Sequence, residues 1–102
     1  MKEMNILEEA NKITHKDRQK AYGKPSENFK QIAQIYEKIT GRYISPRDIV
    51  IIMICTKLSR ESFTHKRDNM VDLAGYSWVL NEVIEDELKD IETKIMAEKN
   101  EL

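Results

Sequence analysis

Cysteine, glycine and proline are scarce in this sequence, which has 102 residues with one cysteine, three glycines and two prolines. A lone Cys55 excludes an internal disulfide and the usual thiolate zinc sites. Because Cys55 stands within an apolar run, we expect it to pack inside the domain. Few helix-breaking residues, and no segment that strictly alternates apolar and polar side chains, predict helices rather than strands.

An excess of one charge is also lacking, since 17 basic residues face 18 acidic ones. We therefore expect no binding to DNA or RNA duplexes and none to an anionic membrane. The longest apolar run, Ile49 to Cys55, is far shorter than the roughly 20 residues that span a bilayer. The N-terminal residues do not resemble a signal peptide. These absences predict a cytoplasmic protein, in the host cell if the chain is viral.

The length predicts one domain over residues 1–102, with a core at about 3–88 and a helical tail at 89–102. Because a domain of this size gains only modest stability from burial, we expect it to form a homo-oligomer. Apolar residues at helical spacing predict a first helix from Glu3 to about Lys16. The stretch from Lys16 to Pro25, which contains Gly23, reads as a loop.

The second predicted helix is capped by Ser26 and ends at Gly41. Ser45, Pro46 and Asp48 predict the start of a third helix, with a capping hydroxyl, proline at the first position and an acid in the first turn. The run from Ile49 is apolar on every face, which is typical of a helix surrounded by protein. Its β-branched residues leave a strand as the alternative.

The fourth predicted helix starts at Arg67 or Asp68 and reaches the mid-90s. Its far end carries a narrow apolar stripe of the kind that packs on a neighbour or a partner subunit. The sequence therefore predicts an all-α fold: a compact four-helix domain with a central buried helix and a long C-terminal helix.

Polar side chains gather where the third helix ends and the fourth begins. Lys57, Arg60 and Glu61 share one helix face. Lys57 follows the apolar run, so its ammonium needs a partner. An ion pair with Asp68 or Asp72 is one interpretation. The other is that the cations grip phosphate directly, or that the carboxylates hold Mg²⁺ that does so.

Two further features belong to this region. Gly75 lies inside a helix, where glycine costs about 1 kcal/mol relative to alanine, which suggests close approach by another backbone or by a ligand. The rings of Tyr22 and Tyr76 are candidates for stacking on a base. His65 lies in the loop between the last two helices and reads as a surface residue rather than a catalytic base.

Several motifs resemble a family of small phage and prophage proteins that is catalogued only as a domain of unknown function. They are Ile6-Leu7-Glu8-Glu9-Ala10, Asp17-Arg18-Gln19-x-x-Tyr22-Gly23-x-Pro25-x-x-Asn28-Phe29, Ser45-Pro46-x-Asp48, Lys57-x-x-Arg60 and Arg67-Asp68-Asn69-x-x-Asp72-x-Ala74-Gly75-Tyr76. The likeness covers roughly residues 5 to 85. A looser likeness connects the chain to phage nucleotide-modification domains and to the all-α MazG-type nucleotide pyrophosphohydrolases.

The MazG-type resemblance implies a metal site built from Glu-x-x-Glu on one helix and Glu-x-x-Asp on the next. The first pair is absent here, so the metal ligands available to such an enzyme would be Glu61, Asp68 and Asp72. This departure puts Mg²⁺-dependent hydrolysis in doubt.

We therefore favour a protein that binds a nucleotide without hydrolysing it, as a phage sponge for an immune signal would, and that needs no cofactor. The alternatives are a MazG-like pyrophosphohydrolase that uses Mg²⁺ and a protein-interaction or scaffold module. The residues that we expect to contact the nucleotide are Arg18, Tyr22, Lys57, Arg60, Arg67, Asn69 and Tyr76.

Overall fold

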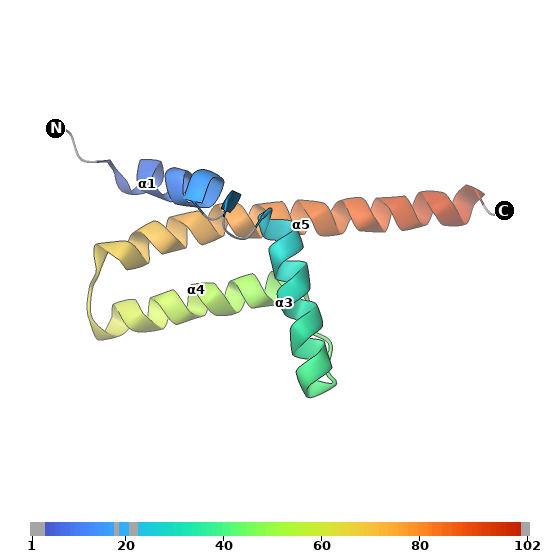
Figure 1. Cartoon of the computed structure of the whole chain (residues 1–102), viewed down its shortest axis with the longest axis horizontal. Helices are drawn as coiled ribbons and strands as arrows, with labels where there is room; N and C mark the ends of the chain where they lie inside the picture. Colours follow the sequence, from blue (N-terminus) through green and yellow to red (C-terminus); the bar gives the residue numbers. More distant parts are fainter. Residues whose placement is uncertain (1–3, 18, 21–22, 101–102) are drawn as a thin grey trace.

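The computed structural model describes residues 4–17, 19–20 and 23–100. The chain runs through α1 (Ile6–Lys12), a π-helical turn η1 (Ile13–Asp17), α3 (Pro25–Thr40), α4 (Pro46–Phe63) and α5 (Arg67–Asn100) (Figure 1). No strand occurs within these described ranges. The predicted all-α class and the long C-terminal helix are confirmed, and the strand alternative for the run from Ile49 is wrong.

The long helix α5 is the element on which the others assemble. It contacts α1, α3 and α4, whereas α4 contacts only α3 and α5 among the described helices. Helices α4 and α5 form an antiparallel hairpin, α1 follows the first half of α5 on its other side, and α3 crosses the hairpin steeply near the start of α4 (Figure 1). The central position that the sequence assigned to the third helix therefore belongs to α5.

The helix ends follow local side-chain chemistry. The Asn5 side chain accepts a hydrogen bond from the Glu8 backbone N–H at 2.8 Å, so α1 begins at Ile6 and not at the predicted Glu3. Ser45 accepts from the Asp48 N–H at 3.0 Å, as predicted. Gly41 ends α3 with φ of 73°, a left-handed conformation that suits glycine.

The predicted cap at Ser26 is wrong, because α3 begins one residue earlier. Lys24 is the N-cap residue, and Pro25 occupies the first turn. Proline is favoured at this position since its missing N–H is one that the helix would leave unbonded. Pro25 is therefore the residue that marks the start of this helix, and Ser26 lies within its first turn.

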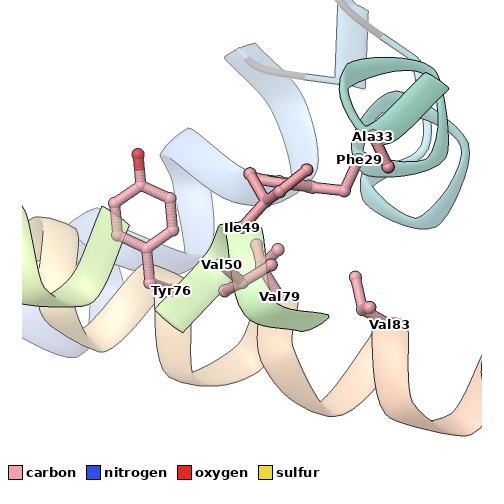
Figure 2. Packing of buried hydrophobic residues seen from close by; sticks show 7 residues of the cluster. All are labelled: Phe29, Ala33, Ile49, Val50, Tyr76, Val79 and Val83. Atoms are coloured by element: carbon pink, nitrogen blue, oxygen red, sulfur yellow. The ribbon is translucent and has the colours of Figure 1, made fainter. Parts of the chain in front are cut away.

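One apolar cluster joins α3, α4 and α5 (Figure 2). Val50 is fully buried at its centre. The buried members are Phe29, Ala33, Ile49, Val50, Tyr76, Val79 and Val83. The cluster fixes α4 against the first half of α5, which is where the candidate functional side chains lie.

The far face of α4 is open, which corrects the prediction of a helix surrounded by protein. Ile51, Ile52 and Leu58 are 41%, 52% and 52% exposed, and Cys55 is exposed rather than packed in a core. The described helices cover α4 from the side of α3 and α5 only. An apolar run therefore did not indicate burial on all sides within one chain.

The second half of α5 extends beyond the rest of the domain (Figure 1). The radius of gyration is 16.6 Å, against about 13 Å for a globular domain of 100 residues. Leu88, Ile91 and Ile95 on this extension are each about half exposed. No helix in the described part of the chain has the length and apolar character needed to cross a membrane.

Candidate functional site

The ion pair between Lys57 and Asp72 lies at the crossing of α4 and α5. Lys57 Nζ is 2.7 Å from Asp72 Oδ2, and the two side chains are only 15% and 21% exposed. Lys57 comes directly after the apolar run of α4, so its stem packs while its ammonium meets the carboxylate of the facing helix. Of the two partners considered from the sequence, the structure selects Asp72.

Arg60 and Asp68 flank this pair without contacting it. Both are exposed, and neither side chain makes a hydrogen bond or ion pair in the described part of the chain. Arg60 follows Lys57 by one turn of α4, so its guanidinium projects from the same side of the helix. Of the four charged residues expected to cluster, Lys57 and Asp72 form an ion pair, and the exposed Arg60 guanidinium lies one turn of α4 away from it.

Glu61 serves the turn between the two helices. Its carboxylate accepts from the Lys66 backbone N–H at 3.0 Å and from the Asn69 amide at 3.2 Å, and it contacts His65. The Lys66 hydrogen bond, followed by the one to His65, lowers the pKa of Glu61 below its ordinary value. The carboxylate therefore caps the start of α5, where the helix dipole favours a negative charge.

Asn69 belongs to the same hydrogen-bonded turn between α4 and α5. It is 5% exposed, and its amide donates to Glu61. A buried amide needs such a partner, because an unsatisfied one is costly. This hydrogen bond gives Asn69 a structural role at the site. His65 lies at the surface, as predicted, with a side chain that is 72% exposed.

Arg67 connects the start of α5 to the N-terminal segment. Its guanidinium forms an ion pair with Glu9 and donates to the Met4 carbonyl oxygen at 2.8 Å. These contacts hold α1 along α5. The Arg67 guanidinium is thus bonded to two groups of the same chain, and both lie about 60 residues earlier in the sequence.

Tyr76 belongs to the core cluster and is 4% exposed (Figure 2). A base could stack on its ring only if the surrounding side chains moved. The close approach expected at Gly75 is real: a Cβ there would lie 3.1 Å from Thr14 Cγ2. The neighbour is thus a side chain of the π-helical turn. A cavity of about 20 Å³ beside Asp72 and Tyr76 has room for about one water molecule.

Two predicted site residues, Arg18 and Tyr22, lie outside the described residues. The three proposed metal ligands have separate tasks: Glu61 caps α5, Asp72 pairs with Lys57, and Asp68 is exposed. Across the described ranges, no group of three histidine, cysteine or acidic side chains is placed to hold a metal ion.

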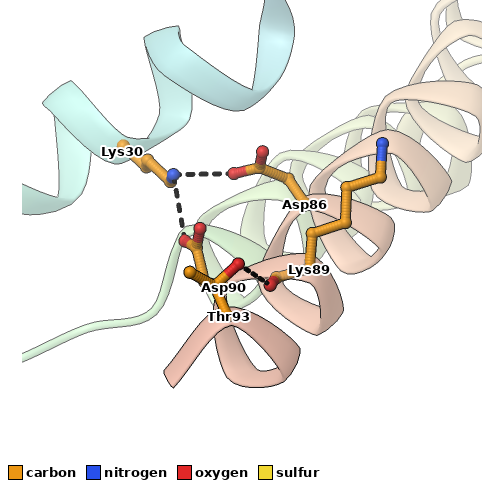
Figure 3. A network of polar contacts seen from close by, with 5 residues as sticks. All are labelled: Lys30, Asp86, Lys89, Asp90 and Thr93. Carbon is orange, nitrogen blue, oxygen red and sulfur yellow. Dashed lines mark hydrogen bonds and ion pairs between the residues drawn. The ribbon is translucent and has the colours of Figure 1, made fainter. Parts of the chain in front are cut away.

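A second charged cluster was missed from the sequence. Lys30 on α3 lies 2.7 Å from Asp86 and 3.2 Å from Asp90 on α5 (Figure 3). Hydrogen bonds to these two carboxylates raise the pKa of Lys30 above its ordinary value. The spacing of Asp86 and Asp90 by one helical turn was a readable signal, but their partner is 60 residues away and only the fold reveals it.

The same region contains a groove of about 540 Å³ between α3 and the outer half of α5. Glu87, Ile91 and Lys94 are among the residues that line it. The Oε2 atom of Glu87 is buried and has no hydrogen-bond partner among the residues that the structure describes. Its Oε1 atom lies 3.9 Å from an Arg47 nitrogen, at the outer limit of an ion pair.

The chain belongs to the family described as Domain of unknown function (DUF6378), whose model matches residues 5–84. The matched part contains α1, α3, α4 and the half of α5 that lies in the core. The extension of α5 beyond residue 84 is outside the match. This finding confirms the predicted resemblance to a family without an assigned role.

Two curated relatives are phage proteins. The chain is 39% identical to the Gene 55 protein of Mycobacterium phage D29 over 83 residues, which cover 80% of this chain and 55% of that protein. It is 36% identical to the Gene 55 protein of Mycobacterium phage L5 over 83 residues, with 78% and 53% covered. The chain thus spans about half the length of these relatives. No solved structure matches.

Proposed function

We propose that this chain is a phage-encoded protein that binds a nucleotide through its phosphate groups and does not hydrolyse it, as a sponge for an immune signal would. One observation carries the proposal: the Arg60 side chain is exposed and has no ion pair with any described residue, one turn after the partly buried Lys57. Phosphate oxygens are suited to a guanidinium, which offers several N–H donors in a fixed plane.

Lys57 can take part without losing Asp72. An ammonium carries three donors, and the described contacts occupy one of them with the Asp72 carboxylate. Asp72 holds the ammonium in place against α5, so a phosphate that reaches it finds an oriented donor. The proposed contacts are therefore Lys57 and Arg60, and Arg18 is included because it belongs to the same resemblance.

Hydrolysis is the less favoured alternative on the same observations. A MazG-like enzyme needs carboxylates that converge on Mg²⁺. In the described structure Glu61 and Asp72 are already bonded to groups of the chain. Nucleotide binding without a metal ion would therefore distinguish the proposed sponge from such an enzyme.

The test is a thermal-shift and calorimetric screen of the full chain with ADP-ribose, cyclic di-AMP and dATP, each with and without Mg²⁺. A ligand present at about 100 times its dissociation constant stabilises by about 2.7 kcal/mol, which a melting curve detects. We expect stabilisation without Mg²⁺ and no product. Turnover that requires Mg²⁺ would establish the enzyme instead.

The variant for this test is Arg60→Ala, because an exposed side chain without a described partner can be removed without harm to the fold. Arg42→Ala is the matched control, an exposed arginine in the connection between α3 and α4. We expect Arg60→Ala to weaken binding at least tenfold and Arg42→Ala to leave it unchanged. Equal affinities of both variants and the parent chain would remove Arg60 from the site.

A protein-interaction or scaffold module is the second candidate function. The open apolar face of α4, with Ile51, Ile52 and Leu58 exposed, favours it. If none of the nucleotides changes the melting temperature, this candidate takes precedence.

A further inference from the structure

The extension of α5 carries an apolar stripe with heptad spacing. Ile84, Leu88, Ile91 and Ile95 stand at i, i+4, i+7 and i+11, the alternating spacing of four and three residues found in coiled coils. Leu88, Ile91 and Ile95 are 54%, 46% and 47% exposed. Among the described helices, nothing covers this stripe along the part of α5 that projects from the domain (Figure 1).

A second observation on the same helix is the buried Oε2 atom of Glu87, which has no hydrogen-bond partner within the described part of the chain. Buried carboxylate oxygens are normally satisfied by a donor, because an unsatisfied one is costly. Glu87 directly precedes Leu88, so it flanks the apolar stripe at the position from which charged residues of a coiled coil reach the partner helix. The Glu87 side chain as a whole is 40% exposed, so its carboxylate can turn toward a helix that covers the stripe.

From these two observations we infer that a second copy of this chain packs its own α5 extension antiparallel against the first. In this register Leu88 lies against Ile91 of the partner subunit, and Ile84 lies against Ile95 of the partner subunit. The twofold axis passes between positions 89 and 90. All four apolar layers of the stripe are then matched with apolar residues.

Charge decides between the two possible directions of the pair. The antiparallel register brings Glu87 beside Lys94 of the partner subunit, and symmetry repeats this attractive contact. It also brings Glu85 near Glu92 of the partner subunit on the other flank. A parallel pair has only repulsive flanks, with Glu87 facing Glu92 and Lys94 facing Lys99. The antiparallel arrangement therefore has the better electrostatics and alone supplies a donor for Glu87.

The local surface suits this partner. Glu87, Ile91 and Lys94 line one groove between α3 and α5, and its volume of about 540 Å³ leaves space for side chains of a second helix. Lys94 is exposed and has no ion pair in the described part of the chain, so it is available to the partner.

The first test is the dimer dissociation constant from sedimentation equilibrium of the full chain. Lys94→Glu places a carboxylate opposite Glu87, and we expect it to weaken the dimer at least tenfold. Lys89→Glu is the matched control: the same charge change on the outer side of the helix, where Lys89 points away from the Lys30 cluster (Figure 3). We expect it to alter the dissociation constant less than threefold. A parallel pair gives the opposite result, since Lys94→Glu would then face Lys99 and tighten the dimer.

Leu88→Glu tests the apolar stripe, with circular dichroism as the check on folding. We expect a folded monomer. A wild-type chain that is monomeric at 100 μM overturns the proposal. So does a dimer that resists Leu88→Glu but dissociates with Ile51→Glu, because the α4 face would then be the interface. These outcomes are independent of nucleotide binding, which is measured separately with Arg60→Ala.

Discussion

Lys57 and Asp72 form an ion pair of 2.7 Å between the C-terminal half of α4 and the second turn of α5. It connects the two helices of the hairpin toward the turn that joins them, away from the apolar cluster around Val50. Because both charged groups are largely removed from water, each depends on the other for compensation. The pair is therefore a structural element as well as a candidate ligand contact.

Removal of one partner should destabilise the hairpin. We expect Asp72→Ala to lower the free energy of unfolding by about 1–3 kcal/mol, since it leaves a partly buried ammonium without a counterion. Urea unfolding followed by circular dichroism measures the change. The double variant Lys57→Met with Asp72→Leu should recover part of the loss, because it removes both charges and retains apolar volume. A double variant as unstable as the sum of Lys57→Met and Asp72→Leu measured singly would argue against direct coupling.

The variant Gly75→Ala combines two opposite contributions to stability, a gain in helix propensity and a loss in packing. Alanine favours the helix by about 1 kcal/mol. Its Cβ would, however, lie 3.1 Å from Thr14 Cγ2, and Thr14 is held by a hydrogen bond from its hydroxyl to the Ala10 carbonyl oxygen. We expect little net change in the melting temperature for the single variant. In a Thr14→Ser background, which lacks the Cγ2 methyl, Gly75→Ala should stabilise by about 1 kcal/mol.

The Ser45 cap gives a prediction with a simple control. Ser45→Ala removes the acceptor for the Asp48 N–H and should cost about 1 kcal/mol of stability. Ser45→Asp retains an acceptor and should cost much less. Ser77→Ala, an exposed serine within α5, should have no comparable effect on urea unfolding. Equal losses at Ser45 and Ser77 would show that the hydroxyl does not act as a cap.

Glu61 predicts a pH effect at the start of α5. Its folded-state pKa is lowered by the hydrogen bonds from Lys66 and His65, so its carboxylate stabilises the fold above the ordinary glutamate pKa. That contribution is lost as the pH falls through the lowered folded-state pKa. Melting temperatures between pH 6 and pH 3 should therefore fall less steeply for Glu61→Gln than for the wild type. Parallel curves would contradict this role.

The sequence predicted best the features that nearby residues determine. Ser45 with Pro46, and Gly41, mark helix ends through hydrogen bonds and backbone angles within one turn. The error at Ser26 shows how two local signals compete when they are adjacent. The short connection between the third and fourth predicted helices likewise brings Lys57 near Asp72, and their ion pair confirms this.

What covers a helix could not be read from its own residues. The run around Ile52 is apolar on every face, yet the described helices supply neighbours on one side only. For the same reason Tyr76 and Asn69, chosen as ligand contacts, proved to be buried among groups of the fold. Side chains suited to a ligand are equally suited to neighbours within the chain, and only the fold shows which neighbours they meet.

The length of α5 converts a small tilt of this helix in the core into a larger displacement of its far end. The helix has no glycine or proline after Gly75, so no such residue favours a bend between Tyr76 and its last residue. With a rise of about 1.5 Å per residue, a tilt of about 5° around Val79 would move Asn100 by about 3 Å. A small adjustment where α4 meets α5 is thus magnified at the distant end.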